Sequence, residues 1–145
     1  MTASRALLGM SLRSVAAAPV PLTVPQHRLL VLVSANGPRR IGTLAEDLGV
    51  NQSNASRLVA RLVEQGLVRR VDDPSDRRAY LVEATGEGLR VLDAVSKQRL
   101  HDLRAVVAAM PPESWGPAVR VLHEFNAAAH ETEAAPMSTD DEETR

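Results

Sequence analysis

The 145-residue chain has no cysteine, so disulfide bonds, thiolate metal ligands and thiol redox chemistry are all excluded. It also has no apolar run long enough to span a bilayer. The N-terminus lacks the basic segment and long apolar stretch of a secretory signal. The length suits one domain with a sizeable core and is too short for two ordinary domains. We therefore expect a single cytoplasmic domain without a membrane segment.

Catalytic and metal-binding patterns are also missing from the sequence. The eight glycines are spread over turns and helix ends and form no phosphate-cradling loop, and no nucleophile, base and oxyanion donor converge. The four histidines, His27, His101, His123 and His130, show no close metal-ligand spacing. The sequence thus predicts neither an enzyme nor a bound metal or other cofactor.

Lysine is nearly absent, since 16 of the 17 basic residues are arginine. The net charge of −1 hides an uneven distribution, because residues 131–145 hold six acidic residues and one arginine, a net −5. The body, residues 1–130, then carries 16 basic and 12 acidic residues, a net charge of about +4. The planar guanidinium of arginine suits phosphates and guanine edges. We expect residues 131–145 to form a disordered acidic tail.

Apolar spacing and helix-ending residues predict a mainly α protein with a small β hairpin. Ser4 is the expected N-cap of the first helix, Pro25 opens the second, Gly49 ends the third, and Asn51 caps the fourth. The expected helices cover residues 4–18, 25–36, a short stretch through 44–48, 52–65, about 85–110 and about 113–129. The expected strands cover residues 40–41, 67–71 and 79–84, with a loop at 72–78.

The predicted helix at 52–65 has two distinct faces. At about 100° per residue, the apolar side chains of Ala55, Leu58, Val59 and Leu62 cluster on one side and should pack inward. The opposite face and its edges are polar, with small residues that let a backbone approach closely. This polar set comprises Gln52, Ser53, Asn54, Ser56, Arg57, Ala60, Arg61 and Glu64.

This polar face follows a short helix and a turn at Gly49, which together predict a helix-turn-helix. In that motif the N-terminal end of the second helix enters the major groove of DNA. Arg57 is then the candidate for a guanine contact, and Gln52 or Asn54 for an adenine contact. An ordinary amphipathic surface helix would show the same polarity, so the prediction depends on the neighbouring turn and hairpin.

The predicted hairpin tip at 72–78 carries Asp76, Arg77 and Arg78. A cation at such a tip can enter the narrow, negative minor groove, and Asp76 is placed to brace the guanidinium of Arg78 in a bidentate pair. Phosphate contacts that position the protein without reading sequence are expected from Arg69, Arg70 and Arg77, and from Arg39 and Arg40. A solvated charged turn is the alternative interpretation of the same tip.

Three segments of the chain resemble the MarR family of transcriptional regulators: LTVPQHRLLVLV, LAEDLGVNQSNASRLVARLVEQGLVRR and DDPSDRRAYLVEATGEG. The resemblance covers roughly residues 5–128. It implies a homodimeric winged helix-turn-helix regulator, usually a repressor, that binds a pseudo-palindromic operator in double-stranded DNA. It also implies that the helix at 52–65 reads the major groove and that Arg78 enters the minor groove.

The same resemblance implies a division of one domain, residues 1–130, into a winged core at about 25–88 and dimerisation helices at about 4–18 and 86–129. The apolar faces of the end helices agree with this, since they exceed what the core needs to bury. A small aromatic or phenolic ligand would enter a cleft near Met10, Arg13, His27 and Leu30. Control by protein abundance without an effector is the alternative. A winged-helix module that binds protein rather than DNA is the main alternative for the whole chain.

Overall fold

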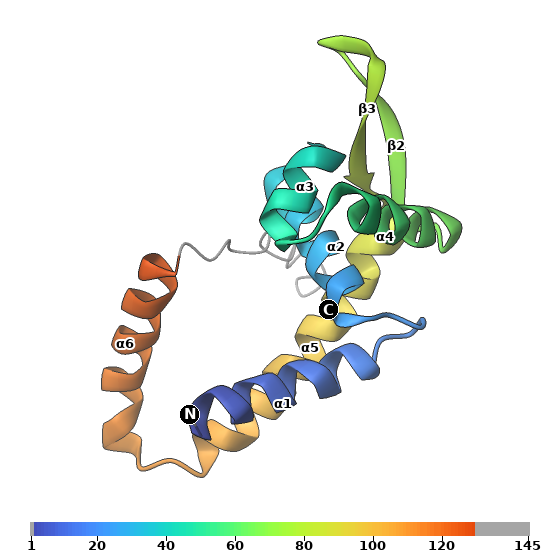
Figure 1. Cartoon of the computed structure of the whole chain (residues 1–145). Coiled ribbons are helices and arrows are strands. Elements are labelled where there is room, and N and C mark those ends of the chain that lie inside the picture. Colours follow the sequence, from blue (N-terminus) through green and yellow to red (C-terminus); the bar gives the residue numbers. More distant parts are fainter. Residues whose placement is uncertain (1, 130–145) are drawn as a thin grey trace, which may run out of the picture.

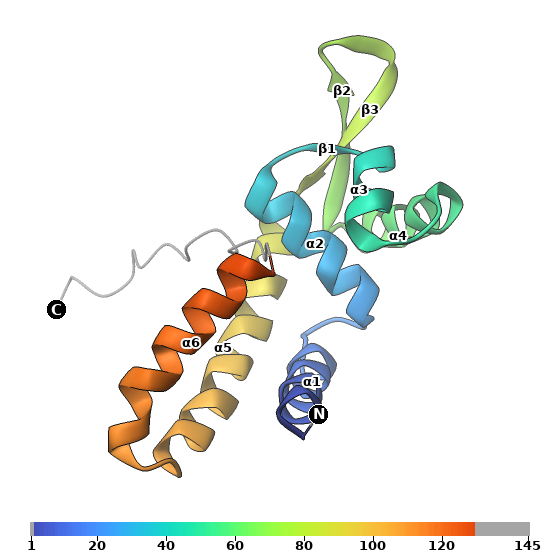
Figure 2. The ribbon, with the colours of Figure 1, turned by 60° about the vertical axis from the view of Figure 1, so that its left-hand side comes forward.

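The structure is a computed structural model that describes residues 2–129, and the expected acidic tail at 131–145 and His130 lie outside them. It confirms a mainly α fold with a small β hairpin. The sheet and helices α2, α3 and α4 lie together at one end, and α1 lies along α5 at the other (Figures 1 and 2). The elements are α1 (Thr2–Ala16), α2 (Val24–Asn36), β1 (Arg39–Arg40), α3 (Ile41–Leu48), α4 (Gln52–Glu64), β2 (Val68–Asp73), β3 (Asp76–Ala84), α5 (Gly86–Ala108), a 3₁₀ turn η1 (Pro112–Ser114) and α6 (Trp115–Ala128).

Two helix starts differ from the expectation. The first helix begins at Thr2, so Ser4 lies inside it and is not its N-cap. The second begins at Val24 because Thr23 forms a capping box with Gln26, in which the Gln26 side-chain oxygen accepts from the Thr23 backbone N–H at 2.8 Å. Pro25 keeps its expected place in the first turn. The box satisfies backbone donors one residue earlier than the proline alone indicated.

Strands β2 and β3 are longer than predicted, and the loop between them is shorter. The order in the sheet is β1-β3-β2, with antiparallel pairing throughout. Pairing continues through Asp72 and Tyr80 and leaves only Pro74 and Ser75 between the strands. The apolar pattern ends near Val71 because the outer hairpin is solvated, but the backbone ladder does not need apolar side chains. The loop prediction of 72–78 was therefore wrong.

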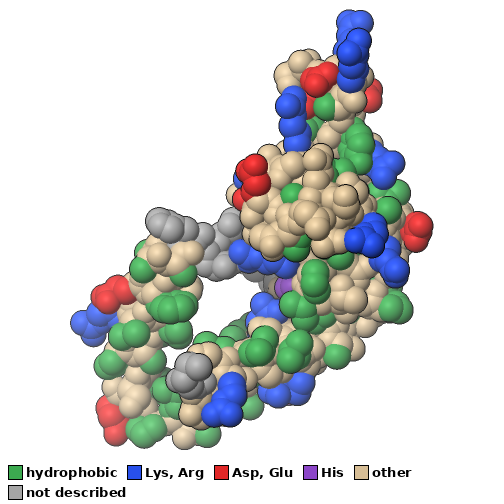
Figure 3. All heavy atoms as spheres, in the orientation of Figure 1, with side chains coloured by type: hydrophobic (Ala, Val, Ile, Leu, Met, Phe, Trp, Pro, Cys, Tyr) green, Lys and Arg blue, Asp and Glu red, His purple; other side chains and the backbone are tan. Residues whose placement is uncertain are grey.

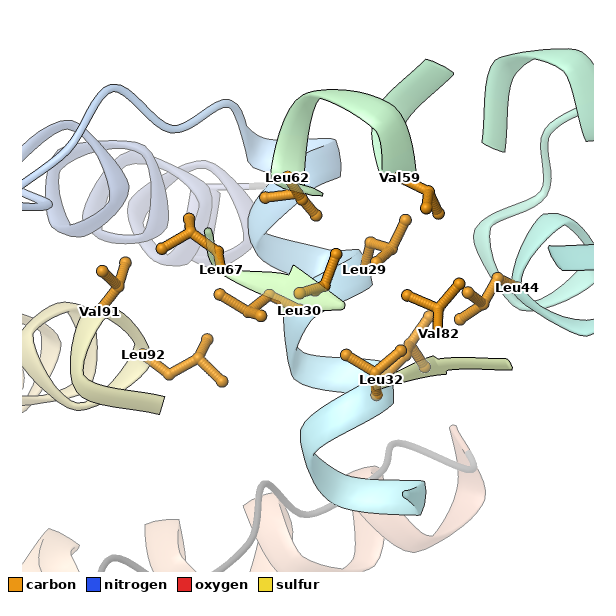
Figure 4. Packing of buried hydrophobic residues seen from close by; sticks show 12 residues of the cluster. Leu29, Leu30, Leu32, Leu44, Val59, Leu62, Leu67, Val82, Val91 and Leu92 are labelled. Atoms are coloured by element: carbon orange, nitrogen blue, oxygen red, sulfur yellow. The ribbon is translucent and has the colours of Figure 1, made fainter. Parts of the chain in front are cut away.

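One hydrophobic core joins α2, α3, α4 and the start of α5 to the sheet, and these elements are called the winged unit below (Figure 4). In α4 the side chains of Ala55, Val59 and Leu62 are fully buried, as the helical wheel predicted, and Leu58 is partly buried. Burying a leucine or valine side chain stabilises the fold by about 1.5–3 kcal/mol. The cluster consists of Leu29, Leu30, Leu32, Val33, Leu44, Val59, Leu62, Leu67, Val68, Val82, Val91 and Leu92.

Two glycines meet backbone requirements in this unit. Gly49 ends α3 at φ 64°, the left-handed conformation that glycine adopts freely, and thereby makes the turn into α4. Gly88 lies in the first turn of α5, where a Cβ atom would come within 2.1 Å of the carbonyl oxygen of Leu67. The absence of a side chain at Gly88 therefore permits α5 to pack directly against the start of the sheet.

Helix α6 lies apart from the core, and none of its residues is buried (Figure 1). Its link to α5 includes a hydrogen bond of 3.1 Å from the indole nitrogen of Trp115 to the carbonyl oxygen of Val107. Apolar side chains gather along α6 and α1 (Figure 3). The exposed large ones on α1, α5 and α6 are Leu7, Leu8, Leu12, Leu89, Leu100, Val106, Val107, Trp115, Val119, Val121, Leu122 and Phe125. Within residues 2–129, no helix combines the length and apolarity needed to cross a membrane.

Candidate nucleic-acid interface

Helix α4 presents the polar face that the sequence predicted. Its N-cap is Asn51, whose side-chain oxygen accepts from the backbone N–H of Asn54 at 2.8 Å. With one face buried in the core, the exposed side chains near its start include Gln52, Ser53 and Arg57. Ser56 and Asn54 are partly exposed, and Arg61 is exposed one turn further on. The helix is thus capped, anchored and open to solvent along the side expected to read bases.

One contact on this face was not anticipated from the sequence. The side-chain oxygen of Asn54 accepts a hydrogen bond from the Nη2 group of Arg57. The i, i+3 spacing brings the two side chains together on the helix surface. Asn54 therefore has a partner other than an adenine base in the free protein, and it orients the guanidinium of Arg57.

At the hairpin tip, Asp76 does not form the predicted bidentate pair with Arg78. Its Oδ1 atom instead accepts from the backbone N–H of Arg78 at 3.0 Å. This Asx-type turn fixes the backbone at Arg78 and leaves its guanidinium unbraced by Asp76. Arg77 and Arg78 are exposed residues of β3, not loop residues. Within residues 2–129 their guanidinium groups make no hydrogen bond or ion pair, and basic side chains extend from the tip of the hairpin (Figure 3).

The lower part of the hairpin is braced by two basic side chains. Arg69 pairs with Glu83, its direct cross-strand neighbour, at 2.7 Å. The guanidinium of Arg70 lies 4.7 Å from the centre of the Tyr80 ring, within cation–π range. Both arginines are exposed and remain candidates for phosphate contacts, but both also stiffen the strands that carry the tip.

The two arginines of β1 have acidic partners. Arg39 lies 3.7 Å from Asp47 of α3. The Nε group of Arg40 donates to Asp73 Oδ2 at 2.6 Å, and its Nη2 group donates to the hydroxyl of Ser75 at 2.9 Å. Nη2 also lies 2.6 Å from Asp73 Oδ2, as an ion pair. Asp73 is almost completely buried. Arg40 was predicted to contact phosphate, but in the structure its guanidinium is bound to Asp73 and Ser75 of the hairpin.

Asp73 is held ionised by these contacts. Hydrogen bonds from the side chain and backbone of Ser75 and then from Arg40 lower its pKa to about 2, from 3.8, against the opposing effect of desolvation. The Asp-Pro-Ser turn was the sequence signal for the contact between Asp73 and Ser75, because an aspartate in such a turn commonly accepts from the residue two positions on. The long-range partner, 33 residues away, had no sequence signal.

The four residues predicted to line a ligand cleft differ in burial and in their partners. Leu30 is fully buried in the winged core. Met10 is also buried, and Arg13 lies 3.5 Å from Asp102 of α5. His27 is partly buried.

His27 does lie in a positively charged environment. Burial lowers its pKa to about 4, from 6.5, and the charges of Arg99 and Arg28 act in the same direction. Arg99 donates to the hydroxyl of the buried Ser14 at 3.3 Å, and burial lowers its pKa as well. Within residues 2–129 Arg99 has no carboxylate partner. Such a half-buried cation beside a neutral imidazole can accept an anion.

A separate cavity of about 690 Å³ lies between the α1–α2 connection and the C-terminal end of α4. Its α4 wall consists of Arg61, Glu64 and Gln65, and none of the four predicted ligand residues lines it. Gln65 donates to the carbonyl oxygen of Pro21 at 2.7 Å and so links α4 to this connection. In the described part of the chain, no three His, Asp or Glu side chains are grouped to hold a metal ion.

Comparison with known proteins supports the same fold and family. A model of the MarR family matches residues 20–79. The solved structure of RV1404 from Mycobacterium tuberculosis is 38% identical, with a TM-score of 0.86 over 92% of this chain and 90% of that one. A MarR family protein from Bacillus stearothermophilus, 22% identical, shares the fold with a TM-score of 0.78 over 90% of this chain and 89% of its own.

Among curated proteins, the chain is similar to the uncharacterized HTH-type transcriptional regulator YfiV of Bacillus subtilis, at 26% identity over 63% of this chain and 58% of that protein. It is also similar to the HTH-type transcriptional repressor NicR of Pseudomonas putida, at 35% identity over 51% of this chain and 47% of NicR. The chain therefore covers less than two thirds of the length of these curated relatives. Neither relative is named as an enzyme.

Proposed function

The protein belongs to the MarR family, whose members are transcriptional regulators and not enzymes, and on that premise we propose that it is a sequence-specific DNA-binding repressor. In this proposal it acts in the cytoplasm as a homodimer on a pseudo-palindromic operator. The observation that carries the proposal is the pairing of a capped, exposed polar helix with an arginine-tipped hairpin. Together they suit the major groove and the adjoining minor groove.

In the proposal, α4 reads bases through Arg57, with Gln52, Ser53 and Ser56 in reach of base edges or phosphates. Arg78 enters the minor groove, and Arg77 and Arg61 contact phosphates. A MepR mutant from S. aureus, 15% identical with a TM-score of 0.66, is bound to an oligodeoxyribonucleotide in its solved structure. That likeness concerns the fold, and it supports the proposal by showing that the fold can accommodate DNA.

The exposed apolar faces support the homodimer. In α6 Val119, Val121, Leu122 and Phe125 are each at least half exposed. Such a surface is costly to hydrate in an isolated chain, at roughly 25 cal/mol for each Å² of apolar surface. A second copy of the chain would bury the faces of α1, α5 and α6 and fix the separation of the two α4 helices. Two-fold symmetry would match that of a pseudo-palindromic operator.

The proposal is tested by selecting bound fragments of genomic DNA with the purified protein and then titrating salt against the selected sequence. Specific binding should weaken steeply with salt because each neutralised phosphate releases counterions, with a slope of about −0.9 per phosphate. Absence of any DNA binding in dilute buffer would overturn the proposal and favour a winged-helix module that binds protein. Light scattering of the same sample reports the dimer.

We also propose that an anionic aromatic ligand releases the protein from DNA by binding near Arg99, His27 and Ser14. The PcaV regulator of Streptomyces coelicolor, 24% identical with a TM-score of 0.59, was solved with its natural ligand. In this chain the support is the half-buried guanidinium of Arg99, which lacks a carboxylate partner within residues 2–129. Of the ligand residues predicted from sequence, His27 remains in this proposal.

A phenolic carboxylate such as 4-hydroxybenzoate serves as the probe for this site. It should displace wild-type protein from the operator and displace Arg99→Gln much less, with unchanged DNA affinity in its absence. Equal displacement of both proteins would remove Arg99 from the site. Failure to displace either protein would favour control by protein abundance.

A further inference from the structure

The side chain of Arg40 connects the start of the helix-turn-helix with the outer end of the hairpin. Its backbone ends β1 and directly precedes α3, the first helix of the helix-turn-helix. Its guanidinium reaches across β3 to the far end of β2, where it contacts Asp73 and Ser75. The hairpin thus touches the helix-turn-helix through a side chain near its tip, as well as through the backbone pairing of β1 with β3.

The contact is a closed set of hydrogen bonds, named here the wing clasp, formed by Arg40, Asp73 and Ser75. Both carboxylate oxygens of Asp73 are used: Oδ2 accepts from Arg40 at 2.6 Å, and Oδ1 accepts from the Ser75 backbone N–H at 2.9 Å and hydroxyl at 2.7 Å. The Ser75 hydroxyl accepts in turn from Arg40 Nη2 at 2.9 Å. A charge-assisted hydrogen bond of this kind fixes orientation more firmly than a neutral one.

Burial distinguishes the wing clasp from the Arg69–Glu83 ion pair of the hairpin. The Asp73 side chain is only 3% exposed, whereas the Glu83 partner of Arg69 is 31% exposed. A buried carboxylate that loses its cation is strongly destabilised, so Arg40 and Asp73 constrain each other. The clasp also lies at the register shift between Asp72 and Asp73, where the backbone ladder is irregular.

We propose that the wing clasp is the positioning device that sets the hairpin relative to the reading helix, so that Arg40 acts on DNA binding through Asp73 and Ser75 and not by contacting phosphate. This inference rests on the proposed function. In it, Arg40 fixes the angle at which Arg77 and Arg78 approach the minor groove while α4 lies in the major groove. A freely swinging hairpin would lose conformational entropy when it docks, and that loss lowers affinity.

The two roles for Arg40 predict opposite signs for Asp73→Ala. If Arg40 contacts phosphate, removing Asp73 deletes a negative charge near DNA, frees the arginine and tightens binding. If the clasp positions the wing, the same change weakens operator binding, by roughly tenfold within the range for one good groove contact. Asp72→Ala is the matched control: Asp72 is exposed, adjacent in sequence and, within residues 2–129, without a side-chain partner. It should bind as well as wild type or slightly better.

A double-mutant cycle and a footprint complete the test. Arg40→Ala with Asp73→Ala should bind no more weakly than the weaker single variant, because both remove one clasp. In a footprint of each of these variants on the operator, protection of the minor groove under the hairpin should be lost while protection of the major groove under α4 remains. General unfolding would remove both. Tighter binding by Asp73→Ala, or additive effects, would overturn the clasp.

Ser75→Ala keeps the net charge and provides a second route if Asp73→Ala fails to fold. It should weaken operator binding severalfold, since the hydroxyl joins both partners, and unchanged binding would count against the proposal. Wild-type protein that binds no DNA would refute the proposed function instead. The two failures are therefore distinguishable.

Discussion

In α4 the side chain of Asn54 accepts a hydrogen bond from Arg57, one turn further along the exposed face. Asn54 is in turn placed by the helix cap, because its backbone N–H donates to the side chain of Asn51. The cap, the asparagine and the arginine therefore succeed one another at intervals of three residues. This arrangement orders the guanidinium before any base is met, which lowers the entropy lost when it docks.

Arg57→Ala should markedly reduce discrimination between operator and unrelated DNA while leaving the oligomeric state unchanged. A good bidentate contact with guanine is worth about 1–3 kcal/mol of discrimination. Fluorescence anisotropy with matched and scrambled duplexes measures this difference in binding free energy. Arg90→Ala on α5 is the control, because Arg90 is an exposed arginine paired with Glu87. Unchanged sequence preference would show that Arg57 reads no base. Asn54→Ala should reduce the same preference by a smaller amount.

Arg78→Ala should weaken operator binding by about 1–3 kcal/mol, the range for a good base contact. The guanidinium is exposed at the hairpin, and within residues 2–129 no carboxylate holds it, so it is free to enter a groove. Competition binding at fixed salt gives the free energy of binding. An affinity equal to that of wild type would mean that the hairpin tip stays outside the minor groove.

Gly88→Ala should destabilise the winged core by about 1–3 kcal/mol, the usual cost of overpacking. The added methyl group would lie 2.1 Å from the carbonyl oxygen of Leu67 and 3.0 Å from a methyl group of Leu30. Urea denaturation monitored by circular dichroism measures the free energy of unfolding. Gly86→Ala is the matched control, since a Cβ there meets nothing within 4 Å. Equal stability of the two variants would contradict the close approach.

His27 should make stability depend on pH. Its pKa is lowered to about 4 in the fold, so between pH 6.5 and 4 the unfolded chain binds a proton that the folded chain does not. The free energy of unfolding should therefore fall as pH falls from about 6.5 towards 4. His27→Gln should lose that component and show a flatter dependence in urea titrations. Identical pH profiles for wild type and His27→Gln would show that His27 has the same pKa in the folded and the unfolded chain.

Phe125→Glu should convert a dimer into a monomer if α6 forms the subunit interface. Phe125 is 66% exposed within a face that also presents Val121 and Leu122. A buried charge without a partner opposes association strongly. Sedimentation velocity measures the mass, with the exposed Arg120→Ala on the same helix as the control. A dimer that survives Phe125→Glu would place the interface elsewhere.

Local sequence signals predicted the winged unit well where one residue and its near neighbours decide the backbone. Gly49 and Asn51 defined the turn and the start of α4, and Thr85 caps α5 by accepting from the N–H of Gly88 at 3.1 Å. These local signals were less reliable where a neighbouring residue could begin the helix instead. Ser4 was expected to cap α1, but the helix begins at Thr2, so Ser4 lies inside it.

The amino-acid sequence by itself determined the helices, the hairpin and the polar face of α4, because capping, turn formation and apolar periodicity operate over a few residues. Only the tertiary structure decided the distant partners of Arg40 and Arg99. Arg40 meets Asp73 across 33 residues and Arg99 meets Ser14 across 85, and no local pattern encodes such encounters. They arise when packing of the core brings distant segments together, so charge alone could not separate an arginine free for DNA from one engaged within the fold.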